Sequence, residues 1–156
     1  MKMRPRTLWS ARALQAGLAL LSLAGHAAPK ASAPRALPNP VLYLTQVESF
    51  QDGGKNYVRY RFGVANSAEY PAEMFAAAPN LPPCDQNAKS SRTWVDIYDQ
   101  QGKRLYGFCA LAKPDDLNSI WFALEETVVP PSYVYIELND RGTNTKYKSN
   151  LAETSL

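Results

Sequence analysis

Segments in which apolar and polar side chains alternate residue by residue constrain the fold of this chain more than any other feature. In Tyr57–Ala65 the apolar side chains of Val58, Tyr60, Phe62 and Val64 occupy every second position. Successive side chains of a β-strand point to opposite faces, so this segment predicts a strand with one face in a core.

Six further β-rich segments are separated by turn sequences that contain Asp, Asn and Gly. We expect strands at 41–47, 92–99, 104–110, 120–124, 133–139 and 145–151, with turns at 51–54, 99–102 and 139–142. Residues 72–78 lie between two prolines and allow a short helical turn. The pattern predicts an all-β chain that folds as a single antiparallel sandwich of about seven strands.

Three of these segments are YVRYRFGVAN (Tyr57–Asn66), VDIYDQQGKRL (Val95–Leu105) and PPSYVYIELND (Pro130–Asp140). Their strand and turn patterns resemble those of bacterial immunoglobulin-like and fibronectin-type domains. The resemblance implies an immunoglobulin-like sandwich, and it carries no function because this fold hosts many. The two cysteines of this chain, Cys84 and Cys109, depart from the widely spaced intersheet disulfide of antibody domains.

The first 27 residues have the pattern of a secretory signal peptide. Basic residues lead into the apolar run Ala13–Ala24, and Gly25-His26-Ala27 offers small residues for cleavage after Ala27. The apolar run is shorter than the roughly 20 residues of a membrane span. We therefore expect a bacterial protein that is periplasmic or secreted and not inserted in the membrane after cleavage.

Cleavage would remove the single histidine and four basic residues, leaving 13 Lys and Arg against 14 Asp and Glu. A nearly neutral chain lacks the positive charge that nucleic acids attract. Without histidine, the mature chain alone has no Ser-His-Asp, Cys-His or His-metal mechanism. The charge and the missing imidazole favour a non-enzymatic protein.

A Pro- and Ala-rich tether is expected at 28–40, followed by the β-sandwich domain at 41–156. Cys84 and Cys109 predict a disulfide, because paired cysteines in an exported domain are usually oxidised. Closing this loop would contribute about 3 kcal/mol. Separate buried thiols are the alternative, and two cysteines without histidine are too few ligands for a metal site.

Carboxylates are the remaining candidates for catalysis, and they occur as the adjacent pairs Asp115-Asp116 and Glu125-Glu126. A glycosidase needs two carboxylates facing each other across a cleft, which adjacent residues do not provide. Asp115, Asp116 and Asn118 could also offer oxygen atoms to Ca²⁺, although the spaced calcium loop is missing and a capped turn explains them. No sequence motif points to a cofactor.

Aromatic and charged side chains on the polar sides of two strands are the candidate binding residues. Rings beside charged groups suit a protein or a carbohydrate. One alternative is that loops cover the rings as a second small core, and Trp121 could be covered or exposed in the same way. The other is that the arginines form a solvated face paired with Asp96 or Glu137. The candidates are Trp94, Asp96 and Tyr98 on one strand and Tyr57, Arg59 and Arg61 on the other.

The leading hypothesis is an exported, non-catalytic binding or structural module that recognises a protein or an envelope glycan. The first alternative is a periplasmic inhibitor or immunity-type protein, in which the Pro-rich segment Asn66–Cys84 blocks an enzyme's cleft. The second is a hydrolase that uses the carboxylates alone.

Overall fold

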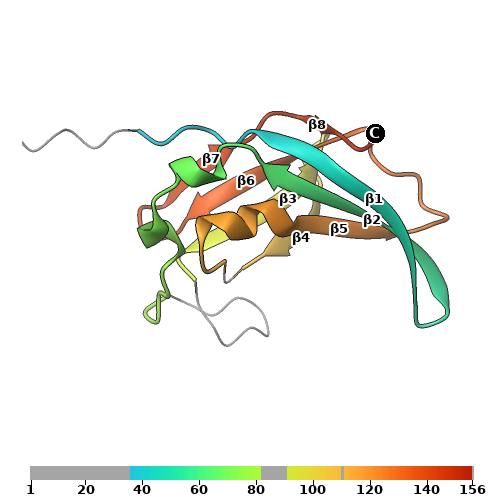
Figure 1. Ribbon diagram of the computed structural model, residues 1–156, viewed down its shortest axis with the longest axis horizontal. Coiled ribbons are helices and arrows are strands. Elements are labelled where there is room, and N and C mark those ends of the chain that lie inside the picture. The colour runs from blue at the N-terminus through green and yellow to red at the C-terminus, as the bar shows by residue number, and fades with distance from the viewer. Residues whose placement is uncertain (1–35, 82–90, 110, 156) are drawn as a thin grey trace, which may run out of the picture. The chain divides into compact units, whose positions relative to one another are not determined.

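Antiparallel strands are the main regular structure of the chain, for which a computed structural model describes residues 36–81, 91–109 and 111–155. One sheet has the strand order β1-β2-β5, and the other has the order β4-β3-β6-β7, with β8 pairing with β6 (Figure 1). The predicted all-β class is confirmed. The strands are β1 (Leu42–Asp52), β2 (Lys55–Val64), β3 (Thr93–Asp99), β4 (Arg104–Phe108), β5 (Ile120–Glu125), β6 (Tyr133–Asp140), β7 (Thr145–Lys148) and β8 (Ala152–Glu153).

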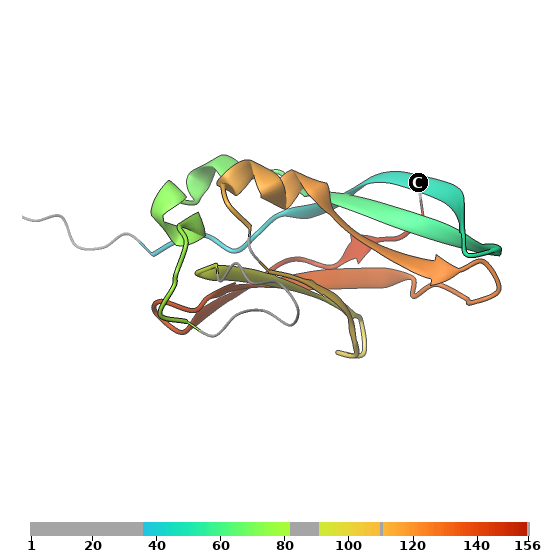
Figure 2. The ribbon, with the colours of Figure 1, turned by 90° about the horizontal axis from the view of Figure 1, so that it is seen from below.

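The two sheets form two layers, and the hydrophobic core lies between them (Figure 2). Rings from the first sheet stack on one another: Tyr60 and Phe62 lie 5.0 Å and 5.9 Å from Phe122, measured between ring centroids. The second sheet contributes branched aliphatic side chains that are fully buried, such as Ile97 and Ile136. The apolar side of each alternating strand therefore faces the opposite sheet, as the period of two predicts.

The β1–β2 hairpin turns at Gly53 and Gly54, whose φ angles are +55° and +78°. A type I′ turn needs positive φ at both central residues, which glycine adopts without steric cost. Asp52 and Lys55 pair directly across the turn. β1 therefore continues up to the turn and is longer than its predicted counterpart.

Three short 3₁₀ helices within the described residues lie at the same end of the molecule (Figure 2): η1 (Ser67–Glu69), η2 (Ala72–Phe75) and η3 (Pro114–Ser119). Their large apolar side chains, Met74, Phe75 and Leu117, are buried and cover this end of the core. The helical turn expected near 72–78 is thus the single 3₁₀ turn of η2.

The last residues of the expected tether contact the domain. The hydroxyl of Tyr70 donates to the carbonyl oxygen of Pro38 at 2.8 Å, and Asn66 Nδ2 donates to that of Asn39 at 3.0 Å. Pro40 is buried. This part of the segment is therefore packed against the domain and does not act as a free spacer.

The signal peptide expected at 1–27 lies outside the described residues, and so does Cys84. The Cys84–Cys109 disulfide therefore stays a prediction. No helix in the described part of the chain is long and apolar enough to cross a membrane.

Candidate functional site

The residues predicted to bind a ligand lie on two different sheets. Trp94, Asp96 and Tyr98 belong to β3, whereas Arg59 and Arg61, with Tyr57 before them, belong to β2. On both strands they alternate with the core side chains, so they face away from the core. Because the core lies between the sheets, the two groups occupy opposite outer surfaces and form no common site.

On the outer face of the β4-β3-β6-β7 sheet, charged side chains are paired across strands. Asp96 accepts hydrogen bonds from Arg104 Nε at 2.7 Å and from Asn139 Nδ2 at 3.2 Å. Glu137 accepts one from Lys146 Nζ at 3.2 Å, which raises the pKa of the lysine. Both acids of this face are therefore paired with cations of neighbouring strands.

The aromatic rings of the same face are covered by neighbouring side chains. Tyr98 stacks on Tyr135 with 5.2 Å between ring centroids, and Lys148 Nζ lies 4.0 Å from the centroid of Tyr135. The guanidinium of Arg141 lies 3.9 Å from the ring of Trp94. These contacts fix the positions of the rings on this face.

Arg59 is the centre of the outer face of the β1-β2-β5 sheet. Its Cζ atom lies 4.3 Å from the ring centroid of Phe50 on β1 and 4.8 Å from that of Trp121 on β5. Phe50 in turn stacks on Tyr57, its cross-strand partner, at 5.4 Å. A guanidinium held between two rings gains cation–π attraction and little freedom to move.

Glu48 is the acidic partner of both arginines of β2. Its Oε1 atom accepts hydrogen bonds from Arg61 Nε at 2.9 Å and from Arg59 Nη1 at 3.1 Å. The hydrogen bond from Arg61 is the largest influence that holds the pKa of Glu48 below its ordinary value. Two guanidinium groups thus share one carboxylate oxygen, which leaves the centre of this face with a surplus positive charge.

The sequence suggested Asp96 or Glu137 as the acidic partner of these arginines, and this prediction is wrong. Both acids belong to the other sheet, where they pair with Arg104 and Lys146. The strand that neighbours β2 on this side is β1, and its register places Glu48 directly opposite Arg59.

Trp121 extends the aromatic surface from β5 to the neighbouring edge strand β4. Its ring stacks on Tyr106 at 5.5 Å and meets the edge of Phe108 at 6.0 Å. Tyr106 keeps 42% of its surface exposed. We call Glu48, Phe50, Tyr57, Arg59, Arg61, Tyr106 and Trp121 the arginine–aromatic surface.

Glu48, Phe50 and Tyr106 of this surface were not among the residues predicted from the sequence. Phe50 and Glu48 sit in the second half of β1, beyond the strand that was expected. Tyr106 occupies a core-facing position opposite Ile97, and it reaches Trp121 only because β4 and β5 meet at one edge. The β1–β2 register is the signal that would have found Glu48 and Phe50, whereas the place of Tyr106 depends on how the two sheets pack.

Two buried polar atoms on these faces have no hydrogen-bond partner among the described residues. They are Arg59 Nε and Trp94 Nε1, and each belongs to a side chain in a cation–π contact. Leaving a buried donor unpaired costs free energy, which the ring contact offsets in part.

The carboxylates considered for catalysis are separated and have structural partners. Asp116 Oδ2 accepts the amide of Ala112 at 2.7 Å at the start of η3, and Glu125 pairs with Lys55 Nζ at 2.6 Å. Strand β5 runs between the two pairs and spans roughly 17 Å, more than the separation that glycoside hydrolysis uses.

The possible calcium ligands also have protein partners. Asn118 Oδ1 accepts the amide of Val64 at 3.1 Å, and its Nδ2 donates to Ser67 Oγ at 3.1 Å. In the chain as far as it is described, no three His, Cys, Asp or Glu side chains come together at a distance that would hold a metal.

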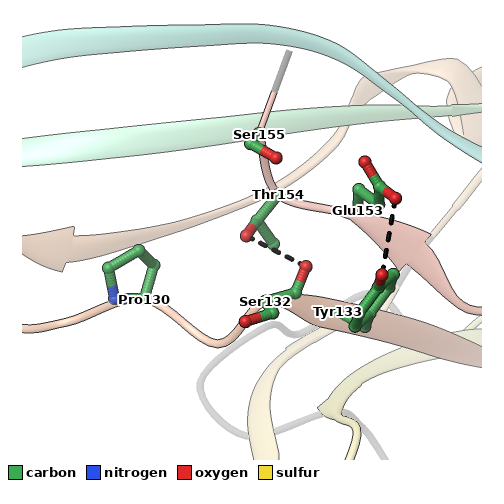
Figure 3. Close-up of a pocket in the computed structure, with 6 residues that line it drawn as sticks. All are labelled: Pro130, Ser132, Tyr133, Glu153, Thr154 and Ser155. Carbon is green, nitrogen blue, oxygen red and sulfur yellow. Dashed lines mark hydrogen bonds between the residues drawn. The ribbon is translucent and has the colours of Figure 1, made fainter.

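A shallow depression of about 390 Å³ lies between the start of β6 and the C-terminal segment (Figure 3). Tyr133 donates from its hydroxyl to Glu153 Oε1 at 3.4 Å, and Thr154 Oγ1 donates to the carbonyl of Pro131 at 2.5 Å. These contacts join the C-terminal segment to β6. The depression was not expected from the sequence and lies apart from the arginine–aromatic surface.

The comparisons with known proteins add no identity to these observations. Neither a protein-family model nor a curated protein matches this sequence.

Proposed function

We propose that the mature chain is an exported, non-catalytic binding module that recognises a protein partner through the arginine–aromatic surface. It has an immunoglobulin-like sandwich, held by a Cys84–Cys109 disulfide. An envelope glycan is the alternative ligand. The observation that carries the proposal is the position of Arg59 between Phe50 and Trp121, with Glu48 shared between Arg59 and Arg61.

The strand order supports an immunoglobulin-like fold. In such domains the first, second and fifth strands form one sheet, while the third, sixth and seventh belong to the other. Here β1, β2 and β5 form one sheet, and β3, β6 and β7 belong to the other, with β4 added beside β3.

The packing of the rings favours a protein over a glycan at this surface. A sugar ring binds best to an aromatic face that is free, but Phe50 and Trp121 are both already stacked against neighbours within the chain. Trp, Tyr and Arg side chains with partly buried, fixed positions are typical of the residues that dominate protein–protein binding energies. Arg59 and Trp121 meet that description, and Tyr106 supplies exposed area beside them.

The charge of the surface indicates which proteins it would attract. Glu48 balances only one of the two guanidinium groups, and Glu125 is already paired with Lys55. The surplus charge would attract an acidic patch on a partner and raise the rate of association at low ionic strength.

The test is a comparison of variants on the two opposite faces. Trp121→Ala and Arg61→Gln alter the arginine–aromatic surface, and Lys146→Gln is the matched control on the other sheet. Envelope and secreted proteins retained by the wild type would be identified, and their Kd measured for each variant. We expect Kd to rise at least about tenfold for the first two variants, which is a loss of about 1.4 kcal/mol of binding free energy. The Kd of the control should stay unchanged.

Thermal unfolding of each variant would show that the fold is kept. Equal Kd values for all three variants would contradict the proposal. Binding to a glycan array that is lost in the Trp121→Ala variant would instead support the glycan alternative. An acidic partner predicts, in addition, that the association rate falls as salt is added.

A further inference from the structure

Glu48 supplies the two arginines of β2 with a carboxylate from within the chain. It lies directly opposite Arg59 in the β1–β2 register, and Arg61 lies two residues further along the same face. Glu48 Oε1 accepts hydrogen bonds from both guanidinium groups, at 2.9 Å and 3.1 Å, and Gln46 Nε2 donates to Oε2 at 3.2 Å. The arginine pair therefore already holds one carboxylate, and this contact indicates the kind of ligand that it accepts.

Glu48 uses only part of the donor capacity of the two guanidinium groups. Arg61 contacts it through Nε and Nη2, whereas Arg59 contacts it through Nη1 alone. Arg61 Nη1 and Arg59 Nη2 have no hydrogen-bond partner among the residues that the structure describes. Guanidinium groups bind carboxylates through several N–H donors at once, so these donors can serve an incoming acid.

A partner can reach this cluster of charges. The side chains of Glu48, Arg59 and Arg61 keep 30%, 24% and 36% of their surface exposed. An ion pair that is open to water contributes little stability, because water replaces the contacts of each group when the pair separates. The carboxylate of Glu48 can therefore turn into solvent at low cost when another carboxylate takes its place.

Contacts other than the one to Glu48 hold Arg59 in place. Its Cζ atom lies between the rings of Phe50 and Trp121, at 4.3 Å and 4.8 Å from their centroids, and these cation–π contacts do not involve the carboxylate. Arg61 lies directly opposite Trp121 in the β2–β5 register, and Trp121 stacks on the half-exposed ring of Tyr106. An incoming acid would therefore meet an ordered guanidinium with an aromatic surface beside it, which lowers the entropic cost of binding.

We infer that Arg59 and Arg61 bind an aspartate or glutamate side chain of the protein partner, and that this carboxylate replaces Glu48. Glu48 is then an internal competitor, which occupies the site in the free protein and weakens the binding of other anions. The inference rests on the function proposed above. It adds which chemical group of the partner is bound and which group of this chain must leave.

Binding of a fluorescently labelled hexaglutamate peptide with blocked ends tests the competition, with fluorescence anisotropy at low ionic strength giving Kd. Glu48→Gln keeps the size of the side chain and removes its charge, so we expect Kd to be about fivefold lower than for the wild type. Glu125→Gln is the matched control, because it removes one acid from the same face, where Glu125 is paired with Lys55. This control should change Kd by less than about twofold.

Two further measurements connect the gain in affinity to the arginine pair and to the exchange itself. Adding Arg61→Gln to the Glu48→Gln variant should abolish the gain, and thermal unfolding would show that each variant keeps its fold. In the wild type, the ¹³C signal of the Glu48 carboxyl group should move to the position of a solvated glutamate when hexaglutamate saturates the protein. The neutral hexaglutamine peptide should leave this signal unchanged.

Equal Kd values of Glu48→Gln and Glu125→Gln for the peptide, or a Glu48 signal that stays in place at saturation, would overturn the inference. Neither result bears on the function proposed above, which the Trp121→Ala and Arg61→Gln variants test with the envelope and secreted proteins themselves. If those two variants lose their protein partner while Glu48→Gln gains nothing toward the peptide, the proposed function stands and the replacement of Glu48 is wrong.

Discussion

Arg92, the residue before β3, and Asp140, the last residue of β6, form a two-pronged ion pair. Arg92 Nε donates to Asp140 Oδ1 and Arg92 Nη2 donates to Oδ2, both at 2.6 Å. The aspartate side chain is only 3% exposed, and the hydroxyl of Thr143 and the amide of Gly142 also donate to it at 2.9 Å. One carboxylate therefore fixes both the start of β3 and the β6–β7 turn.

Replacing Arg92 by leucine should destabilise the protein by about 3 kcal/mol, because the buried carboxylate of Asp140 loses its charge partner. Urea unfolding at neutral pH measures this loss. Lys146→Leu is the control, since the exposed pair of Lys146 with Glu137 should contribute less than about 1 kcal/mol. Similar losses for the two variants would contradict the structural role given to Arg92.

The stability of the protein should fall in acid because of Asp140. Burial raises the pKa of this carboxyl, but the hydrogen bonds from Arg92, Thr143 and Gly142 outweigh it and hold the pKa below the ordinary value of 3.8. Because the pKa is lower in the folded than in the unfolded state, the stabilisation by ionised Asp140 is complete above about pH 4. It is lost as the pH falls through the pKa that Asp140 has in the folded protein.

Unfolding free energies measured between pH 7 and pH 2 test this assignment. The Asp140→Asn variant should be less stable at neutral pH and should lose less stability below about pH 4 than the wild type. Parallel pH profiles for the two proteins would show that other carboxylates dominate.

The two glycines of the β1–β2 turn should differ in their tolerance of side chains. Gly53 has a φ of +55°, which asparagine adopts readily at the first position of a type I′ turn, so Gly53→Asn should change stability by less than about 0.5 kcal/mol. Gly54 has a φ of +78°, which a β-branched side chain disfavours, so Gly54→Val should lower the free energy of unfolding by about 1 kcal/mol. Thermal unfolding of both variants measures the difference, and equal losses would argue against this turn type.

Phe122 should be among the most sensitive core positions. It is 1% exposed and contacts both Tyr60 and Phe62, so Phe122→Ala should lower the free energy of unfolding by about 3–5 kcal/mol. Val129→Ala is a control at a side chain that is 88% exposed, and it should be nearly neutral. Chemical denaturation checks both values, and a loss below 1 kcal/mol for Phe122→Ala would contradict the core described here.

Alternation and turn residues were sufficient to predict most of the strands, because both signals are local. Val58, Tyr60 and Phe62 mark the core side of β2, and Asp99 with Gly102 marks the β3–β4 turn, where the Asp99 carboxylate accepts the amides of Gln101 and Lys103. The last predicted strand was less accurate. β7 ends at Lys148, and a separate short strand, β8, pairs with the start of β6.

The candidate site was predicted only in part, because its partners come from other strands. The outward direction of Arg59 and Arg61 follows from the period of two, but the identity of their acid does not. It depends on β1 continuing to the turn and on a bulge before Gln46 that sets the register. For the same reason, Trp94 and Arg59 could not be assigned to opposite surfaces from their own strands alone.

The sequence by itself determined the class of fold, the turns and the face of each strand that is buried, since these follow from the geometry of neighbouring residues in a strand. The tertiary structure decided which strands are neighbours. That choice placed Glu48 beside the two arginines of β2, brought Trp121 to Tyr106, and put β1 at the edge of its sheet. Sheet pairing joins residues far apart in the chain, and it is settled by how the two sheets bury their apolar faces together, which no local pattern encodes.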